Sequence, residues 1–316
     1  MKVVVSDLLT EKFKTELLDE FPDAEFVFVD GENEYEAVQD ADVLMGYPNR
    51  DVFLSAKKLR WLHCPGTGID KLMGIPELMD SDVVVTNARG PHADPIADHG
   101  MAMVLTFSHH LRSLWDDQKE KKWDLGSYDN RMISLQDAIM GIFGMGDIGS
   151  AMAKRAVAFG MKVYAVDKYI STKPDGVEEV WGVDKIKDLV EISDWFVVAA
   201  PYTSETHHAL NRELLSSMKV GARLIVLSRG GIVDESALIE ELSNGRISGV
   251  GLDVTEIEPL PVNSPLWDHP DVVISPHVSA LTSEMWDGRR EIFKENLRRF
   301  ISNRPFLYTC DKHRGY

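Results

Sequence analysis

The sequence predicts an α/β fold in which helices cover parallel sheets, and two patterns carry this prediction. Short runs rich in β-branched residues alternate along the chain with segments of helical period. A glycine-rich turn, GMGDIG, stands where one such run gives way to a helical segment. The length of 316 residues favours about two domains, and no fixed-period repeat or low-complexity tract is visible.

The first part of the chain is expected to form one small α/β unit. A helical segment at 11–21 separates the first two strand-like runs, and further helical segments separate the others. The five expected strands lie at 2–7, 24–30, 41–46, 59–64 and 82–87.

An apolar-rich segment at 95–123 runs for several helical turns and is expected to lead from one domain into the next. A second α/β unit is expected from about Ala138 to His277. Its six strands lie in the runs AIMGIF, MKVYAVD, DWFVVAA, ARLIVLS, ISGVGLD and DVVISPH. The tail at 283–304 is expected to form one amphipathic helix that crosses back onto the first domain. The expected domains are a discontinuous one, 1–97 with 285–316, and an inserted one, 98–284.

Charge and cysteine content exclude several classes of protein. The formal net charge of -17 argues against a nucleic-acid or anionic-membrane partner, because phosphates are bound by clustered Lys and Arg. A small anionic substrate is not excluded, since one local Arg can outweigh a distant negative surface. Cys64 and Cys310 have no paired spacing, so neither a disulfide framework nor a metal site is expected. The opening MKVVVSDLL lacks signal-peptide features and no segment has the roughly 20 apolar residues of a membrane span, so we expect a cytoplasmic protein.

The turn GMGDIG is suited to a dinucleotide. Gly144 allows the tight turn, Gly146 lets a pyrophosphate approach the backbone, and Gly149 permits close packing of helix on strand. The helix that follows offers free N–H groups and a partial positive charge to phosphates. About twenty residues on, Asp167 ends the next strand, where a carboxylate accepts the ribose hydroxyls of NAD and repels the 2′-phosphate of NADP. NAD is therefore expected as cofactor, with NADP less favoured, although the neighbouring Lys168 softens that preference.

Three residues near strand ends suit the reduction of a 2-keto acid. Arg229 ends LIVLSRGG, where its planar fork can clamp a carboxylate and a neighbouring carbonyl. His277 follows the last strand, at the same sheet edge, and can give or take a proton. A carboxylate bonded to this imidazole would fix its tautomer and stabilise its charged form. Glu258 and Glu256 both lie in the DVTEIEP turn, and spacing alone does not choose between them.

The chain resembles the D-isomer-specific 2-hydroxyacid dehydrogenase family. The resemblance rests on ordered motifs: GMGDIG, Asp167, LSRGGIVDE, GLDVTEIEP and SPHVS, preceded by LHCPGTGID and TNARGPHADPIADH and followed by the closing RGY. It implies a doubly wound Rossmann NAD-binding domain inserted into a flavodoxin-like substrate domain, and homodimers formed through the NAD domain.

The resemblance also implies residue roles. It makes Arg229 the substrate-binding arginine and His277 the acid–base, and it selects Glu258 as the carboxylate behind the histidine. The cofactor residues that it implies are Asp147 and Ile148 at the pyrophosphate, Leu227 and Ser228 beside the nicotinamide, and Asp253 at the nicotinamide amide. The substrate carboxylate would be held by the backbone amides of Gly66, Thr67 and Gly68, whose glycines suit an anion nest.

The chain departs from the family pattern in two places near the expected cleft. Ser279-Ala280 follows the histidine motif where Gly-Gly or Gly-Ser is common, and ADH replaces Ala-Glu-His at 97–99. Because of these departures, the resemblance does not identify the substrate, although it still indicates the type of reaction. Formate dehydrogenases share the scaffold but carry glutamine at the position of Glu258, which disfavours that relative.

The expected reaction is the NAD-dependent interconversion of a small 2-keto acid and a D-2-hydroxy acid. One alternative is an NAD(H)-responsive binding module like the C-terminal-binding-protein corepressors, which share the scaffold and the trio; no long disordered tail or basic patch supports it. Another is a transhydrogenase-like or alanine-dehydrogenase-like relative, which the spacing of Glu258 and His277 disfavours. The sequence does not identify the side chain of the substrate. Candidate walls of the substrate pocket lie at 47–50, 89–92 and Trp286.

Overall fold

The computed structural model describes residues 1–29, 33–169 and 173–315. Contacts within the chain divide it into a first unit, Met1–Pro91 with Thr282–Tyr316, and a second unit, His92–Leu281. The borders between these units fall a few residues before the expected domain borders at 97 and 284. Asp30 of the expected strand 24–30 and Tyr316 of the closing RGY lie outside the described residues.

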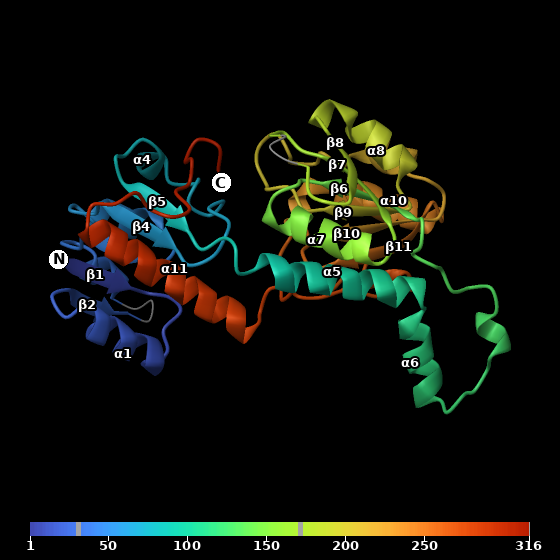
Figure 1. The fold of residues 1–316 in the computed structure, drawn as a ribbon, viewed down its shortest axis with the longest axis horizontal. Helices are drawn as coiled ribbons and strands as arrows, with labels where there is room; N and C mark the ends of the chain where they lie inside the picture. The colour runs from blue at the N-terminus through green and yellow to red at the C-terminus, as the bar shows by residue number, and fades with distance from the viewer. Residues whose placement is uncertain (30–32, 170–172, 316) are drawn as a thin grey trace. The chain divides into compact units, whose positions relative to one another are not determined.

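The first unit contains a parallel sheet of five strands in the order β2-β1-β3-β4-β5 (Figure 1). Each expected run holds one strand: β1 (Lys2–Val5), β2 (Glu25–Phe28), β3 (Val43–Met45), β4 (Trp61–Cys64) and β5 (Val84–Asn87). The order 2-1-3-4-5 is that of flavodoxin, with the change of chain direction between β1 and β3. The predicted flavodoxin-like fold is thereby confirmed for this unit.

Helices cover the first sheet, and one of them comes from the end of the chain. They are α1 (Glu11–Glu20), α2 (Glu34–Ala37), α3 (Arg50–Ser55), α4 (Pro76–Met79) and α11 (Ser283–Ile301). α11 packs on the sheet through Phe293, whose ring stacks on that of Trp61 with 5.5 Å between centroids. The buried ammonium of Lys294 in α11 forms ion pairs with Glu16 and Glu20 of α1, at 3.0 and 2.9 Å. The amphipathic tail therefore belongs to the first unit, although about 190 residues separate it from the rest in sequence.

The second unit contains a parallel sheet of seven strands in the order β12-β11-β10-β9-β6-β7-β8. The six expected strands are β6 (Ile139–Phe143), β7 (Lys162–Val166), β9 (Trp195–Val198), β10 (Ala222–Val226), β11 (Ile247–Leu252) and β12 (Val272–Ile274). Counted within the unit, the order is 3-2-1-4-5-6-7, the doubly wound Rossmann arrangement extended by one strand. The predicted Rossmann fold is thereby confirmed.

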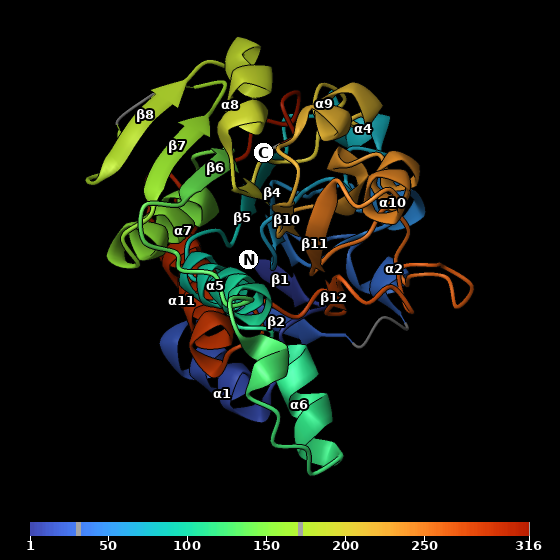
Figure 2. The ribbon, with the colours of Figure 1, turned by 90° about the vertical axis from the view of Figure 1, so that its right-hand side faces the viewer.

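The seventh strand, β8 (Val177–Trp181), escaped the sequence prediction. Figure 2 shows it at the end of the sheet, beside β7. As an edge strand it needs little apolar surface, and Glu178 and Glu179 in its middle are exposed. Its sequence, VEEVW, is therefore too polar to be recognised by its hydrophobic pattern.

Most helices of the second unit flank its sheet, whereas one, α6 (Leu111–Lys119), extends from α5 (Ala93–Ser108) away from it (Figure 1). The others are α7 (Asp147–Ala158), α8 (Ile186–Ile192), α9 (Arg212–Ser217) and α10 (Glu235–Ser243), with short 3₁₀ turns η1 (Gly126–Tyr128), η2 (Val183–Lys185) and η3 (Gly230–Ile232). The segment 95–123 thus holds two helices, because His110 adopts a left-handed φ of 48° between them. Among the described residues, no helix combines the length and apolar character that crossing a membrane requires.

Candidate active site

The GMGDIG turn lies at the switch point of the second sheet, where β6 and β9 lie side by side. Gly144 has φ +96°, and a Cβ atom there would lie 2.5 Å from the backbone of Ala200. A Cβ on Gly149 would lie 2.0 Å from the carbonyl oxygen of Gly144. At Gly146, by contrast, no atom lies within 4 Å of the Cβ position. The turn is therefore closed at its first and third glycines and open at the second.

The open side of this turn is the N-terminus of α7, where Gly146 is the N-cap and Asp147 and Ile148 are the first helical residues. The N–H groups of a first helical turn have no partners within the helix, so they are available to an anion. Ile148 is half-buried, and Met152 and Ala156 are fully buried. The spacing of Ile148, Met152, Ala156 and Phe159 in the sequence predicts one apolar face, but Phe159 is 44% exposed, so the prediction is wrong for Phe159. It follows the end of the helix, and Ala153 fills the core instead.

Asp167 follows β7 and is tied to the glycine turn. Its Oδ2 accepts a hydrogen bond from the Met145 N–H at 2.6 Å, and its Oδ1 accepts one from the Tyr169 N–H at 2.7 Å. The carboxylate is thereby held at the edge of the turn, with lone pairs left for other donors. The neighbouring Lys168 forms an ion pair with Glu205 at 2.5 Å, which offsets part of its charge.

The structure shows which of the two carboxylates, Glu258 or Glu256, contacts His277. Nδ1 of His277 lies 2.9 Å from Oε2 of Glu258, within hydrogen-bond distance. Glu256 has a different partner, since its Oε1 lies 2.9 Å from Nε2 of His208. Glu258 is therefore the carboxylate behind His277. The side chains of this pair are 46% and 40% exposed, so the imidazole is accessible to a ligand.

A buried carboxylate holds the backbone around His277, which adopts a left-handed φ of 56°. Asp253, at the end of β11, accepts hydrogen bonds at Oδ1 from the N–H of Val278 (3.0 Å) and at Oδ2 from that of Ser279 (3.1 Å). It also accepts one from the Ser275 hydroxyl at 2.6 Å. These bonds stabilise a backbone conformation that is rare for residues other than glycine. The predicted contact of Asp253 with a nicotinamide amide stays a prediction.

His99 of α5 extends this network, since its Nε2 lies 2.8 Å from the Ser275 hydroxyl. The sequence motifs indicate no role for Ser275, and they single out His99 only within the ADH departure at 97–99. The signal for Ser275 was its position two residues before His277. No pattern in the sequence shows that α5 lies beside the end of β12, because that proximity arises from tertiary packing.

Arg229 lies just beyond β10, in extended backbone that caps η3, and is half-buried. Its Nη1 donates a hydrogen bond to the carbonyl of Ser228 at 2.8 Å. A Cβ on the following Gly230 would lie 2.0 Å from the backbone of Thr255. The segment after Arg229 therefore packs directly on the turn that carries Glu258, which brings the ends of β10 and β11 together.

The two residues before Arg229 differ in their surroundings. The side chain of Leu227 is buried in the core, where a Cβ on Gly100 of α5 would lie 2.8 Å from it. Only the backbone of Leu227 is thus left to face a cofactor. The hydroxyl of Ser228 is buried and has no hydrogen-bond partner among the described residues. A buried, unpaired hydroxyl costs free energy, so a ligand group that pairs with it would be stabilised.

The loop of Gly66, Thr67 and Gly68 belongs to the first unit and follows β4. The Gly66 carbonyl accepts a hydrogen bond from the Ala88 N–H at 2.8 Å, and the Thr67 carbonyl accepts one from the Asn87 side chain at 2.7 Å. The carbonyls of this loop are thus bound to the end of β5. The predicted binding of a substrate carboxylate by its amides stays a prediction.

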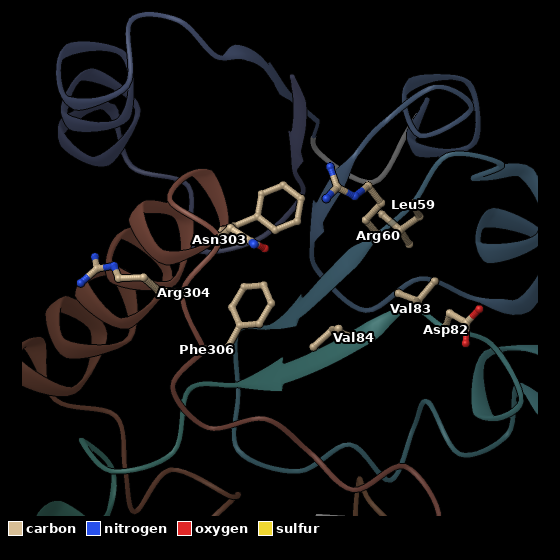
Figure 3. A pocket seen from close by; sticks show the side chains of 9 residues that line it. Leu59, Arg60, Asp82, Val83, Val84, Asn303, Arg304 and Phe306 are labelled. Atoms are coloured by element: carbon tan, nitrogen blue, oxygen red, sulfur yellow. The ribbon is translucent and has the colours of Figure 1, made fainter.

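Two further features carry no predicted site residue. A hollow of about 470 Å³ in the first unit lies at the amino ends of β4 and β5, beside the end of α11, and Arg60, Val84 and Phe306 are among its lining residues (Figure 3). It lies at the opposite end of the strands from the loop 66–68, so we do not place chemistry there. Among the described residues, no group of three or more His, Cys, Asp or Glu side chains is arranged to hold a metal ion.

Comparison with known proteins gives a consistent result. The model of the D-isomer specific 2-hydroxyacid dehydrogenase NAD-binding domain matches residues 101–279. The chain is 34% identical over 260 residues to the D-3-phosphoglycerate dehydrogenase of Bacillus subtilis (strain 168), a match that covers 81% of this chain and 48% of that protein. It is 32% identical over 301 residues to the glyoxylate reductase of Korarchaeum cryptofilum (strain OPF8), covering 92% and 88%.

A solved structure agrees over the whole chain. The D-isomer specific 2-hydroxyacid dehydrogenase from Xanthobacter autotrophicus Py2 superposes with a TM-score of 0.87 at 26% identity, covering 100% of this chain and 99% of that one. The chain spans about half the length of the first relatives, 48% of the Bacillus subtilis protein and 57% of the phosphoglycerate dehydrogenase of Methanocaldococcus jannaschii. The resemblance inferred from the motifs is confirmed: the chain belongs to the D-isomer-specific 2-hydroxyacid dehydrogenase family.

Proposed function

We propose that this protein is an NAD-dependent oxidoreductase that interconverts a 2-keto acid and a D-2-hydroxy acid. The observation that carries the proposal is the hydrogen bond of 2.9 Å between His277 and Glu258, in the same unit and at the same sheet edge as Arg229. An acid–base pair beside an arginine fork suits a carbonyl that is attached to a carboxylate. Relatives named glyoxylate reductase and hydroxypyruvate reductase act on acids of this class.

Each of the three residues has one chemical task. Glu258 binds Nδ1 of His277 and so leaves Nε2 to exchange a proton with the substrate oxygen. In the reducing direction, His277 protonates the oxygen as negative charge develops on it. Arg229 holds the substrate carboxylate and stabilises that developing charge. A nicotinamide cofactor, when bound, would supply the hydride in this direction and accept it in the other.

The residues around the glycine turn fit a dinucleotide. The open space at Gly146 leaves room for a pyrophosphate at the N–H groups of Asp147 and Ile148. Among the family's solved structures, the Xanthobacter autotrophicus protein is in complex with NADPH, so the cofactor class is NAD or NADP. We expect NAD to be preferred here, because Asp167 would repel a 2′-phosphate and Lys168 is paired with Glu205.

The remaining assignments are proposals of the same kind. Leu227, Ser228 and Asp253 would face the nicotinamide, and the amides of Gly66, Thr67 and Gly68 would bind the substrate carboxylate. A homodimer formed through the NAD-binding domain and a cytoplasmic location complete the proposal. Light scattering of the purified protein tests the dimer directly.

The decisive test is NADH oxidation by the purified protein with a panel of 2-keto acids: glyoxylate, hydroxypyruvate, pyruvate and larger homologues, with NADPH in parallel. We expect turnover with at least one acid and a higher kcat/KM for NADH than for NADPH. A higher kcat/KM with NADPH would contradict only the cofactor preference. A protein that binds NADH but reduces none of these acids would contradict the enzyme assignment and restore the binding-module alternative, which the names of the relatives do not favour.

A further inference from the structure

Asp253 is a buried residue that holds the backbone on both sides of the acid–base histidine. Its carbonyl oxygen accepts a hydrogen bond from the N–H of His277 at 2.8 Å. Its carboxylate accepts two more, from the N–H groups of Val278 and Ser279 at 3.0 and 3.1 Å. A buried carboxylate keeps one orientation where its oxygens are bonded, so the groups that fix Asp253 also fix the turn that carries the imidazole.

The hydrogen atoms of this network can be assigned by counting donors. An ionised carboxylate only accepts, so the contact of 2.6 Å between the Ser275 hydroxyl and Oδ1 of Asp253 uses the single hydrogen of that hydroxyl. The Ser275 oxygen is then left to accept, and Nε2 of His99, which lies 2.8 Å away, must donate to it. The hydrogen bonds therefore run in one direction, from His99 through Ser275 to Asp253.

His99 stands on a helix that is fixed against the sheet of the same unit. In α5, a Cβ on the next residue, Gly100, would lie 2.8 Å from the side chain of Leu227, just beyond β10. One turn further along, Met103 packs on β11, where a Cβ on Gly251 would lie 2.7 Å from its sulfur. Because both contacts are close, α5 cannot move towards the sheet, and the donor of His99 has a fixed place beside the ends of β11 and β12.

Holding this turn matters because His277 adopts a left-handed φ of 56°, which costs free energy for a residue with a side chain. The bond to Glu258 orients the imidazole ring, whereas the bonds to Asp253 orient the backbone that carries it. We propose that His99 and Ser275 are positioning residues: by holding Asp253, they keep the acid–base imidazole where it can transfer a proton. The inference rests on the proposed function and adds two residues to the site of that function.

Removal of the first donor should slow the reaction without weakening substrate binding. With saturating NADH and the preferred 2-keto acid, His99→Leu should lower kcat by about tenfold, because the hydrogen bond that steadies the network is lost. The KM for the acid should change by less than about twofold, since Arg229 is untouched. His99→Gln carries an amide N–H that can replace the donor, so it should recover most of the kcat. A change in KM alone, or an equal loss of kcat in His99→Gln, would overturn the proposal.

Ser275 offers a second pair of variants. Ser275→Ala breaks the link and should lower kcat at least as much as His99→Leu, whereas Ser275→Thr keeps the hydroxyl and should retain kcat within about threefold. The matched control is His109→Leu, the same substitution just past the other end of α5, where the imidazole is exposed and makes no hydrogen bond among the described residues. Its kcat should stay within about twofold of the wild type. A loss as large as that of His99→Leu would overturn the proposal.

A double variant shows whether the effect passes through Asp253. Asp253→Asn alone should lower kcat, because the carboxylate that accepts these hydrogen bonds is lost. If His99 acts by holding this carboxylate, adding His99→Leu to Asp253→Asn should lower kcat by less than about twofold more. A further loss of about tenfold, as expected for independent sites, would contradict the proposed role.

Hydrogen exchange provides a readout that does not need turnover. The amide hydrogens of Val278 and Ser279 should exchange about tenfold or more faster in His99→Leu and Ser275→Ala than in the wild type, and at close to the wild-type rate in His99→Gln. Melting temperatures identify any variant that has lost its fold.

The outcomes separate this inference from the function on which it rests. A wild-type protein that reduces 2-keto acids, with unchanged exchange and unchanged kcat in His99→Leu, would overturn the positioning role and leave the proposed function intact. A wild-type protein that reduces no 2-keto acid would overturn the proposed function and, with it, the positioning role, even if the exchange rates change as expected.

Discussion

The two units differ in how their buried polar groups are partnered. In the second unit, the groups around His277 are bonded to one another: His277 to Glu258, and Asp253 to the backbone on the far side of His277. In the first unit, the buried Nε of Arg289 in α11 has no hydrogen-bond partner among the described residues. The groups around His277 are thereby held in one geometry, whereas a buried, unpaired donor is left for a ligand to satisfy.

Two histidines, one in each unit, also differ in their surroundings. Both occur in strand-like runs of the sequence, but His63 lies within β4 of the first unit and is fully buried, whereas His277 follows β12 and its side chain is 46% exposed. His63 contacts the Thr86 hydroxyl at 2.8 Å and packs between the rings of Trp61 and Phe293. Burial lowers its pKa to about 3, so it stays neutral and serves the core. The predictions below test these assignments, from the largest expected effect to the smallest.

The largest effect is expected when the acid–base group is removed. His277→Ala should lower kcat by about 10²- to 10⁴-fold, the usual contribution of a positioned proton donor. The Kd for NADH should stay within about twofold, because the imidazole is assigned to the substrate. Steady-state kinetics and fluorescence titration of NADH measure the two quantities. A comparable loss of NADH affinity would make His277 a structural residue like His63.

The two carboxylates of the DVTEIEP turn form a matched pair. Glu258→Gln keeps a hydrogen-bond acceptor for His277 but removes the charge, so kcat should fall by about 10- to 100-fold. Glu256→Gln alters only the contact with His208 and should change kcat by less than about threefold. Similar losses in the two variants, measured in the same assay, would show that the turn rather than the His277–Glu258 bond matters.

The glycine turn offers a test that separates folding from binding. Gly149→Ala places a Cβ 2.0 Å from a backbone oxygen and should lower the free energy of unfolding by about 1–3 kcal/mol. Gly146→Ala meets no atom within 4 Å, so stability should change by less than about 0.5 kcal/mol. Its methyl group would occupy the space proposed for the pyrophosphate, so the Kd for NADH should rise by about tenfold or more. Unchanged NADH binding in Gly146→Ala would argue against a cofactor at this turn.

The smallest effect concerns pH and stability. Because the folded-state pKa of His63 lies below its unfolded value of about 6.5, the unfolded chain binds this proton more readily. The free energy of unfolding should therefore fall as pH drops below about 6.5, by at most about 1.4 kcal/mol per pH unit from this group. His63→Phe keeps an aromatic ring and should flatten that slope in urea titrations between pH 6.5 and 5. An unchanged slope would assign the pH dependence to other groups.

Much of this protein was determined by local patterns in its sequence. Strand runs, the glycine turn, and Arg229 and His277 at strand ends could be predicted because backbone period and turn chemistry are encoded within a few neighbouring residues. The tertiary structure decided what depends on distant segments: Glu258 rather than Glu256, Asp253 and Ser275 behind the histidine, and the edge strand β8. It also brought Lys294 of α11 onto Glu16 and Glu20 of α1, which lie more than 270 positions away in the sequence. Side-chain partners are chosen by packing across the sheet, and no local pattern in a single sequence contains that information.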